Sequence, residues 1–503
     1  RYDNVRNRFR SMSAANYSFS CAAIKSLKMG SFSDFDCKQC HFLTCSEDEN
    51  ICTADDLHGE NRNLEIPEFV YKGVDLIEKG LDAAIKATGN DILQYNLPVV
   101  IGHIVNAVAG KICCEGVHPN LFMLKIGETS TGKSDIDKAF RREYSSFFDV
   151  IRQDSNGKDK FFNTFYGAND FSSGPAFLRS LQRLPQSLIL MDEAKFLFER
   201  KGKIDSVTEA KIAAILEIST TSGTRYTKPY ANLDSEITID NPVPTLVGNA
   251  TSDIFSALSV DDLSSGLIQR FEFYCYDGKA KYRQRPTSSE KERALQLFIQ
   301  GLDSLVMLDI FKDFYMIRNV PYDMKNPKTP DVGITKEASE LLEVHSISVI
   351  DKTNSESDNG KKGIISRSYH NAIKYAILHS VSTRNGRAVF DPIAVEDIEY
   401  GIKFANFMTD WKLNVLVKNL SAGDWAQKVD TMFQAIVAAN KMSQKPTGKV
   451  LKNRRRKLED LKPHEWDAAV KTLKAQGKII LKEEKIKGKD TTCYYVKKGY
   501  DND

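Results

Sequence analysis

The segment from Gly127 to Ser134 reads GETSTGKS, a complete G-x-x-x-x-G-K-S motif. An apolar run at 121–126 that favours a strand precedes it, and helical spacing at 133–150 follows. In that context the loop's backbone N–H groups surround phosphates, the lysine reaches the β- and γ-phosphates, and the serine holds Mg²⁺. A chance glycine-rich turn is the alternative. The residues expected to bind ATP and Mg²⁺ are Gly127, Glu128, Thr129, Ser130, Thr131, Gly132, Lys133 and Ser134.

Two further apolar runs end in polar side chains suited to hydrolysis. The run at 187–191 ends in Asp192 and Glu193, and we expect it to be a strand neighbouring the one before the motif. Asp192 would share Mg²⁺ with Ser134, and Glu193 would orient or deprotonate the attacking water. The run at 242–247 is followed by Asn249, whose amide would hold that water or the γ-phosphate. A solvated acidic pair and a turn asparagine are the alternatives.

Arg270 stands immediately before an alternating aromatic stretch, Phe-Glu-Phe-Tyr. Such an arginine is a surface residue, an intramolecular ion-pair partner, or an arginine finger that stabilises charge on a neighbouring subunit's ATP. These three alternatives remain open on the residues alone.

In combination, three stretches resemble the superfamily 3 helicases of viruses and mobile elements, which are AAA+ hexameric motors. They read PNLFMLKIGETSTGKS, SLILMDE, and NPVPTLVGNATSDIFSAL with GLIQRFEFY. More narrowly, they are similar to the helicase half of phage and plasmid primase–helicases, over about 65–280. The resemblance implies ATP bound between one subunit's Lys133, Ser134, Asp192 and Glu193 and the next subunit's Arg270, with Asn249 as a sensor. One departure is Val-Gly-Asn here, where many members have Thr-Ser-Asn.

The same family places a DNA-gripping β-hairpin between the acidic strand and the asparagine strand. The matching stretch, 222–232, interleaves Arg225 and Lys228 with Tyr226 and Tyr230. Cations and aromatics in alternation suit the phosphates and bases of single-stranded DNA. An ordinary exposed hairpin is the alternative.

Five of the nine cysteines lie in the first 52 residues: Cys21, Cys37, Cys40, Cys45 and Cys52. The C-x2-C pair presents two thiolates on one turn, and Zn²⁺ takes four S or N ligands. We therefore expect four of these five to bind Zn²⁺; an iron–sulfur cluster is not excluded by the spacing. His41 and His58 are candidate substitutes. Free thiols are the alternative.

The net charge of +3 conceals an uneven distribution. Residues 424–503 hold 19 basic and 11 acidic side chains, which gives +8 and indicates a polyanionic partner. Helical spacing at 425–440, 447–460 and 464–476 precedes two strand-like runs at 478–486 and 491–497, an order that predicts a winged helix. Phosphate contact is better supported than base reading; a protein-binding wing is the alternative. The candidate DNA contacts are Arg454, Arg455, Arg456, Lys478, Lys487 and Lys489.

Short apolar strands separated by helices predict an α/β fold, with helices on both faces of a parallel sheet. Given the resemblance, we expect an AAA+ P-loop domain within five regions. These are a Cys-rich module at 1–60, a helical collar for oligomerisation at 65–115, the ATPase at 116–285, a helical domain at 286–420 and the winged helix at 424–503. Residues 354–363 read as a polar linker.

The function expected is ATP-driven translocation along single-stranded and forked DNA by a hexamer, in the replication of a phage or mobile element. The start at Arg1 and the Cys-rich module make an upstream primase–polymerase domain an expected partner. With neither a signal segment nor a membrane span, a cytoplasmic location in a bacterial host is expected. Two alternatives are an ATPase switch, such as a replication initiator or defence factor, and a non-catalytic DNA-binding scaffold stabilised by ATP.

Overall fold

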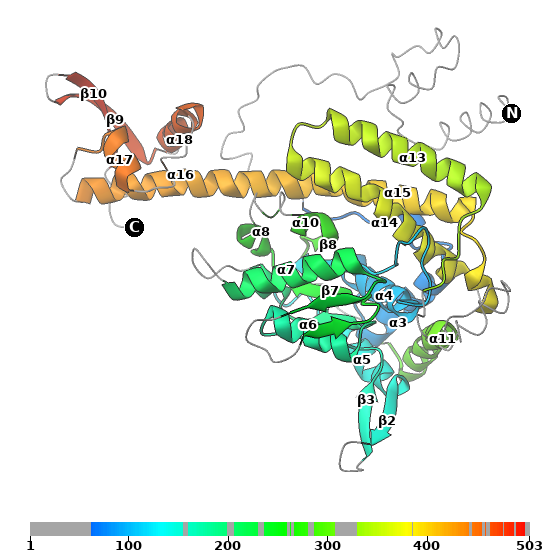
Figure 1. The fold of residues 1–503 in the computed structure, drawn as a ribbon. Coiled ribbons are helices and arrows are strands. Elements are labelled where there is room, and N and C mark those ends of the chain that lie inside the picture. Colours follow the sequence, from blue (N-terminus) through cyan, green and yellow to red (C-terminus); the bar gives the residue numbers. More distant parts are fainter. Residues whose placement is uncertain are drawn as a thin grey trace, which may run out of the picture. The chain divides into compact units, whose positions relative to one another are not determined.

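The computed structural model forms two compact units, joined between Asn414 and Val415. The described residues are 62–153, 159–198, 206–229, 236–258, 262, 266–279, 286–306, 329–384, 386–441, 445–454, 458, 463–475, 477–486 and 489–497. The five amino-terminal cysteines, His41, His58, Tyr230, Arg455, Arg456 and Lys487 lie outside them. Figure 1 shows the elements of each unit.

The core of the first unit is a four-stranded parallel sheet with the order β4-β7-β1-β8. Its strands are β1 (Phe122–Gly127), β4 (Leu188–Met191), β7 (Thr245–Ala250) and β8 (Phe271–Tyr276). Nearly every strand residue is buried, as the continuous apolar runs predicted. The expectation that the strand before Asp192 neighbours β1 is wrong, because β7 lies between them.

Helical elements cover both faces of this sheet, which confirms an α/β fold. Gly102 of α4 (Leu93–Ala107) lies against Met123 and Val247. On the other face, Gly248 meets Ala194 of the short helix η5 (Ala194–Leu197). The segment predicted as a collar contributes α3 (Asp75–Thr88) and α4; every residue of α4 after Leu93 is buried, so α3 offers most of the surface left for that role.

Further short elements complete this α/β part. They are η3 (Glu68–Val70), α5 (Asp135–Tyr144), η4 (Ser145–Phe147), α6 (Gly174–Arg183), α7 (Ser206–Thr221), α8 (Ile254–Ala257) and α10 (Leu267–Arg270). It also contains two antiparallel hairpins: β2 (Asp149–Gln153) with β3 (Asp159–Asn163), and β5 (Tyr226–Lys228) with β6 (Ile237–Ile239). The second hairpin overlaps the stretch expected to grip DNA. The helix expected over 133–150 ends earlier, at Tyr144, because β2 of the first hairpin begins at Asp149.

The remaining described residues of the first unit are mainly helical, as the spacing after Asp277 predicted. They form α11 (Ser288–Val306), α13 (Lys336–Ser355), α14 (Asn359–Thr383), η6 (Gly386–Phe390), α15 (Val395–Trp411) and a π-helical turn, η7 (Lys412–Leu416), which crosses into the second unit. The polar linker is shorter than predicted, because α13 continues to Ser355 and Asp358 caps α14 by accepting a hydrogen bond from the Lys361 N–H.

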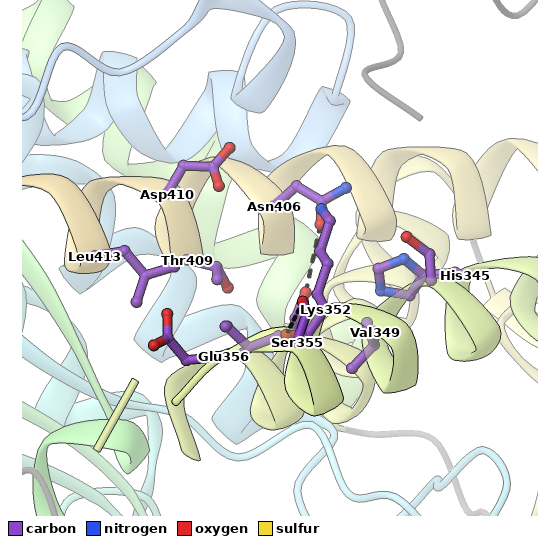
Figure 2. Close-up of a pocket in the computed structure, with 12 residues that line it drawn as sticks. His345, Val349, Lys352, Ser355, Glu356, Asn406, Thr409, Asp410 and Leu413 are labelled. Atoms are coloured by element: carbon purple, nitrogen blue, oxygen red, sulfur yellow. Dashed lines mark hydrogen bonds between the residues drawn. The ribbon is translucent and has the colours of Figure 1, made fainter. Parts of the chain in front are cut away.

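A pocket of about 310 Å³ lies where α13, α14 and α15 meet (Figure 2). His345 on its wall is 6% exposed, and its Nε2 has no hydrogen-bond partner. Burial lowers the pKa of His345 to about 4, so the imidazole is neutral at physiological pH. Lys352 and Asp410 add opposite charges to the lining. None of the site residues predicted from the sequence lines this pocket.

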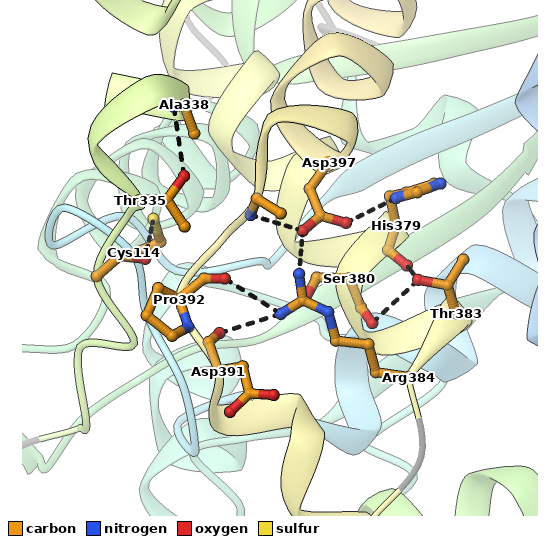
Figure 3. A network of polar contacts seen from close by, with 12 residues as sticks. Cys114, Thr335, Ala338, His379, Ser380, Thr383, Arg384, Asp391, Pro392 and Asp397 are labelled. Carbon is orange, nitrogen blue, oxygen red and sulfur yellow. Dashed lines mark hydrogen bonds and ion pairs between the residues drawn. The ribbon is translucent and has the colours of Figure 1, made fainter. Parts of the chain in front are cut away.

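The junction of α14 and α15 is held by one buried carboxylate, Asp397 (Figure 3). It accepts hydrogen bonds from His379 Nδ1 at 2.7 Å, from the Arg384 guanidinium and from the Ala394 N–H at 2.9 Å. The last contact satisfies a backbone donor at the start of α15. Asp397 is 2% exposed, and its three donors fix the position of the start of α15 relative to the end of α14.

The described residues of the second unit form three helices and an antiparallel hairpin. They are α16 (Val417–Lys441), α17 (Gly448–Arg454), α18 (Pro463–Ala475), β9 (Ile479–Ile486) and β10 (Lys489–Val496). Met432, Ile436, Leu451 and Leu473 are buried in one apolar core. This element order agrees with the spacing read from the sequence. The described helix α17 ends at Arg454, before the predicted 460.

Among the described residues, no helix is both long enough and apolar enough to span a bilayer. The same residues contain no cluster of three or more His, Cys, Asp and Glu side chains arranged to hold a metal ion. The four described cysteines, Cys113, Cys114, Cys275 and Cys493, are buried free thiols. Because the predicted zinc ligands lie outside the described residues, the Zn²⁺ expectation stays a prediction.

Candidate functional site

The P-loop connects β1 to α5 at the carboxyl edge of the sheet. Ser130 and Gly132 have φ values of 66° and 87°, so two residues of the loop take the left-handed conformation. Left-handed residues interspersed in a loop turn neighbouring N–H groups toward the same side, where they form a concave anion site. Residues 128–130 are exposed, which leaves the mouth of the loop open to a ligand.

Lys133 folds back over the loop. Its Nζ donates to the Gly127 carbonyl at 2.5 Å and to the Glu128 carbonyl at 2.7 Å. Burial lowers the pKa of this amine. Backbone carbonyls are weak partners for a half-buried cation, so phosphate oxygens arriving at the loop would replace them with a stronger, charge-assisted contact.

A neighbouring helix clamps the loop from behind. Tyr95 of α4 shares a 2.8 Å hydrogen bond with the Thr131 hydroxyl, which in turn donates to the Glu128 carbonyl at 2.7 Å. A Cβ on Gly127 would lie 1.9 Å from the Tyr95 oxygen. Glycine is therefore needed at the first motif position because α4 approaches so closely.

The strand order places Asn249 between the acidic residues and the P-loop. Asn249 lies on β7 and pairs in register with Lys125 of β1. The strand on the other side of β7 is β4, and Asp192 directly follows it. Asn249 Nδ2 donates to Asp137 Oδ2 at 2.7 Å and reaches Asp192 Oδ1 at 3.5 Å. Two carboxylate neighbours assign the NH₂ group to that side. Asn249 Oδ1 is left buried with no hydrogen-bond partner.

An ion pair beneath the loop was not predicted from the sequence. Lys125, fully buried in β1, lies 2.6 Å from Asp137 of α5 and also donates to the Lys133 carbonyl at 2.8 Å. Asp137 thus connects the P-loop strand, the helix after the loop and Asn249. A signal was available: a lysine inside the apolar run LFMLKI must find an acid if the strand is buried.

Asp192 and Glu193 are exposed at the same edge of the sheet. Asp192 lies 3.6 Å from the Lys138 amine of α5. The structure therefore brings Lys133, Ser134, Asp192, Glu193 and Asn249 to one edge of the sheet, around the mouth of the P-loop.

Arg270 does not join this group. It ends α10 immediately before β8, and β8 pairs in parallel with β1 so that Phe271 opposes Phe122. Arg270 therefore lies at the amino edge, whereas the P-loop leaves the carboxyl edge. At a rise of about 3.3 Å per residue, the six residues of β1 separate these edges by roughly 17 Å.

In the β5–β6 hairpin, the two predicted DNA-binding cations are paired with acids. Lys228 contacts both oxygens of Glu217 at 2.8 and 2.7 Å, and Arg225 lies 2.8 Å from Asp240. Tyr226 is 7% exposed and donates its hydroxyl hydrogen to Glu217. DNA would have to displace Glu217 and Asp240 to use these cations.

The predicted contacts of the second unit lie on its hairpin and beside it. Lys489 is exposed at the start of β10, and Lys478 precedes β9 with its amine 5.3 Å from the centre of the Phe433 ring. The α17 helix ends at Arg454.

Comparison with known proteins assigns no family. No protein-family model matches the chain, and no curated protein matches its sequence. Among solved structures it is similar to a full-length MCM homolog from Methanopyrus kandleri, at 13% sequence identity and a TM-score of 0.29. The match covers 67% of this chain and 61% of that protein, so the chain spans less than two thirds of its length. A likeness of this size supports no conclusion about function.

Proposed function

We propose that this chain is an ATP-dependent DNA helicase or translocase that works as a ring, a hexamer, in the replication of a phage or mobile element. The position of Asn249 is the observation that best supports ATP hydrolysis in this proposal. The Asn249 amide nitrogen faces Asp137 and Asp192, and its buried oxygen lacks a partner beside the P-loop. A buried acceptor without a donor is costly unless a ligand or water supplies one.

The residues present fit ATP with Mg²⁺. The left-handed Ser130 and Gly132 orient loop N–H groups toward phosphates, and Lys133 exchanges its carbonyl contacts for phosphate oxygens. Ser134 and Asp192 would be the oxygen ligands for Mg²⁺, which would neutralise charge on the phosphates. Glu193 would take the proton of the attacking water, and Asn249 Oδ1 would accept a hydrogen bond from that water and so orient it.

Arg270 is proposed to act on the nucleotide of another subunit. The sheet separates it from its own P-loop by the length of β1. Its Nε donates to Ser219 at 2.7 Å and one terminal nitrogen donates to the Gly266 carbonyl, so no acid neutralises it through a described contact. A positive group held at a surface edge without an acid suits charge stabilisation in a neighbour's transition state.

DNA contact is proposed at two places. In the first unit, Lys228 and Arg225 of the β5–β6 hairpin would exchange their acids for phosphates. In the second unit, the three helices and hairpin are interpreted as a winged helix whose Lys478 and Lys489 follow the DNA backbone. The +8 charge of residues 424–503 supports phosphate contact there.

Steady-state ATPase with and without single-stranded DNA tests this function. Glu193→Gln should lower kcat by about 10²- to 10⁴-fold, because the general base is lost, and should leave ATP binding intact. Glu340→Gln, on the exposed face of α13, is the matched control and should keep parental turnover. No turnover by the parent would leave only the non-catalytic scaffold. Turnover stimulated by DNA without strand separation would identify an ATPase switch.

A further inference from the structure

A second set of cations surrounds Arg270 at the amino edge of the sheet. Arg367, His370, Asn371 and Lys374 lie on one stripe of α14, at three- and four-residue steps. They line a small pocket with Arg270, Gln269, Ser219 of α7 and the start of β1. Two separate elements, α10 and α14, thus bring Arg270, Arg367 and Lys374 to one place.

Among the described residues of the lining, three cations stand against one carboxylate, Glu272. Lys374 donates to the Asn120 carbonyl at 2.6 Å, and Arg270 uses the Ser219 hydroxyl and the Gly266 carbonyl. Neither of them, nor Arg367, forms an ion pair with a described acid. Glu272, the one carboxylate of the lining, lies 2.8 Å from Lys412 and accepts from Asn371 at 2.7 Å. It is therefore already committed to another cation.

Burial of these cations, and secondly their closeness to one another, has a free-energy cost that a bound anion would lower. Burial, and then the nearby Arg367, lower the pKa of Lys374 to about 7. Burial, and then Arg367, lower that of Arg270 to about 10. Three cations share one carboxylate in this lining, Glu272, which attracts Lys374 but is ion-paired with Lys412, and this surplus of positive charge indicates that a negative group from outside completes the pocket.

The space in the pocket limits what that group can be. It measures about 30 Å³. A volume of this size admits one or two water-sized groups. It therefore takes the end of an anion, such as the oxygens of one phosphoryl group, while the rest of the ligand stays outside.

We propose that Arg270, Arg367 and Lys374 form an oxyanion pocket that receives the terminal phosphoryl group of a nucleotide held by a second copy of this chain. The second copy is the favoured source because the chain's own P-loop opens at the opposite edge of the sheet. This source rests on the proposed ATPase function. The oxyanion pocket itself does not.

Thermal unfolding of the Lys133→Ala chain tests the pocket without a working P-loop. Inorganic phosphate, compared with KCl at equal ionic strength, should raise the Tm by a few degrees in a saturable manner. Arg367→Gln or Lys374→Met, added to Lys133→Ala, should abolish that rise. Lys361→Gln removes a cation from the same helix outside the pocket and should keep it. An equal rise in all four chains overturns the pocket.

Mixing subunits tests the source of the phosphoryl group. Arg367→Gln chains and Lys133→Ala chains should each have at least tenfold lower ATPase than the parent. Their verified mixed oligomers should regain activity, because one interface then pairs an intact P-loop with an intact pocket. No recovery in such oligomers overturns the second copy as the source. A parent without turnover ends the proposed function, and the phosphate response in Lys133→Ala still decides the pocket.

Discussion

At the scale of single residues, the Lys125–Asp137 pair is the structural centre of the candidate ATP site. Both side chains are buried, and Asp137 also orients the Asn249 amide. Replacing one member of a buried ion pair by a neutral residue leaves the other as an unpaired charge that is shielded from water. The pair therefore links the stability of the sheet to the geometry of the proposed hydrolytic site.

Lys125→Met should lower the free energy of unfolding by about 3–5 kcal/mol, because Asp137 loses its counter-ion. Urea denaturation measures the loss. The double variant Lys125→Met/Asp137→Asn should lose less than the two single variants together, since no lone charge remains. Lys79→Met, at the exposed pair with Asp75, is the control and should cost less than about 1 kcal/mol. Equal losses at both positions would contradict this account.

The lowered pKa of Lys374 should make the free energy of unfolding depend on pH. Its pKa is about 7 in the fold against 10.5 in a free lysine, so between these values the unfolded chain binds a proton that the folded chain does not. Stability from this group therefore rises as pH increases from about 7 towards 10.5, and its penalty is fully present below pH 7. The charged or titratable groups lining the same pocket are Arg270, Glu272, Arg367 and His370.

Lys374→Met should flatten that rise. Urea unfolding of the parent and the variant at matched ionic strength, over the range from neutral to alkaline pH, measures the difference. Lys361→Met on the same helix is the control and should keep the parental slope. Parallel profiles for the parent and Lys374→Met would contradict the assignment of the slope to Lys374.

At the scale of elements, the P-loop keeps its shape because α4 lies directly behind it. Gly127→Ala should destabilise the loop and weaken ATP binding, since the new methyl group would overlap the Tyr95 oxygen. Tyr95→Phe removes that oxygen and should restore part of the ATP affinity in the double variant. Tyr276→Phe changes a tyrosine that packs edge-on against Tyr95 and should give no rescue. Calorimetric ATP binding by the four chains measures this, and equal affinity for Gly127→Ala and the double variant would contradict it.

The elements differ in how far the sequence predicts them. The four strands of the parallel sheet read as continuous apolar runs because both faces are covered, so their positions are predicted closely. The β2–β3 hairpin is missed although Asn156-Gly157, a strong turn signal, stands between its strands. The helix predicted over 133–150 instead runs past the observed end of α5 at Tyr144 and into the start of β2 at Asp149.

The candidate site divides in the same way. The P-loop and Asp192-Glu193 are contiguous motifs, so local spacing predicts them. The contact between Arg270 and the α14 cations joins positions about a hundred residues apart, and Asp137 meets Asn249 across 112 residues. Such pairings depend on strand order, and local spacing does not reveal that β7 lies between the acidic strand β4 and β1.

At the scale of the whole molecule, the second unit has its own apolar core and its own surplus of positive charge. If its hairpin follows a DNA backbone, each lysine that contacts phosphate releases about one counter-ion. Lys489→Ala should therefore weaken binding to a forked duplex and reduce the slope of log Kd against log salt by about 0.9. Lys336→Ala, exposed on α13 of the first unit, is the control.

Fluorescence anisotropy between about 50 and 200 mM KCl measures that slope. The effect should be the same for different DNA sequences, because phosphate contacts carry no sequence information. A slope unchanged in Lys489→Ala would favour a hairpin that binds protein.

The P-loop and the oxyanion pocket occupy opposite edges of one parallel sheet. A chain that offers a nucleotide on one side and receives one on the other joins its copies through two unlike surfaces, and such head-to-tail contacts close into a ring or continue as a filament. The nucleotide is then part of the interface between subunits. Its apparent affinity should rise with protein concentration, and dilution should release nucleotide and subunits together.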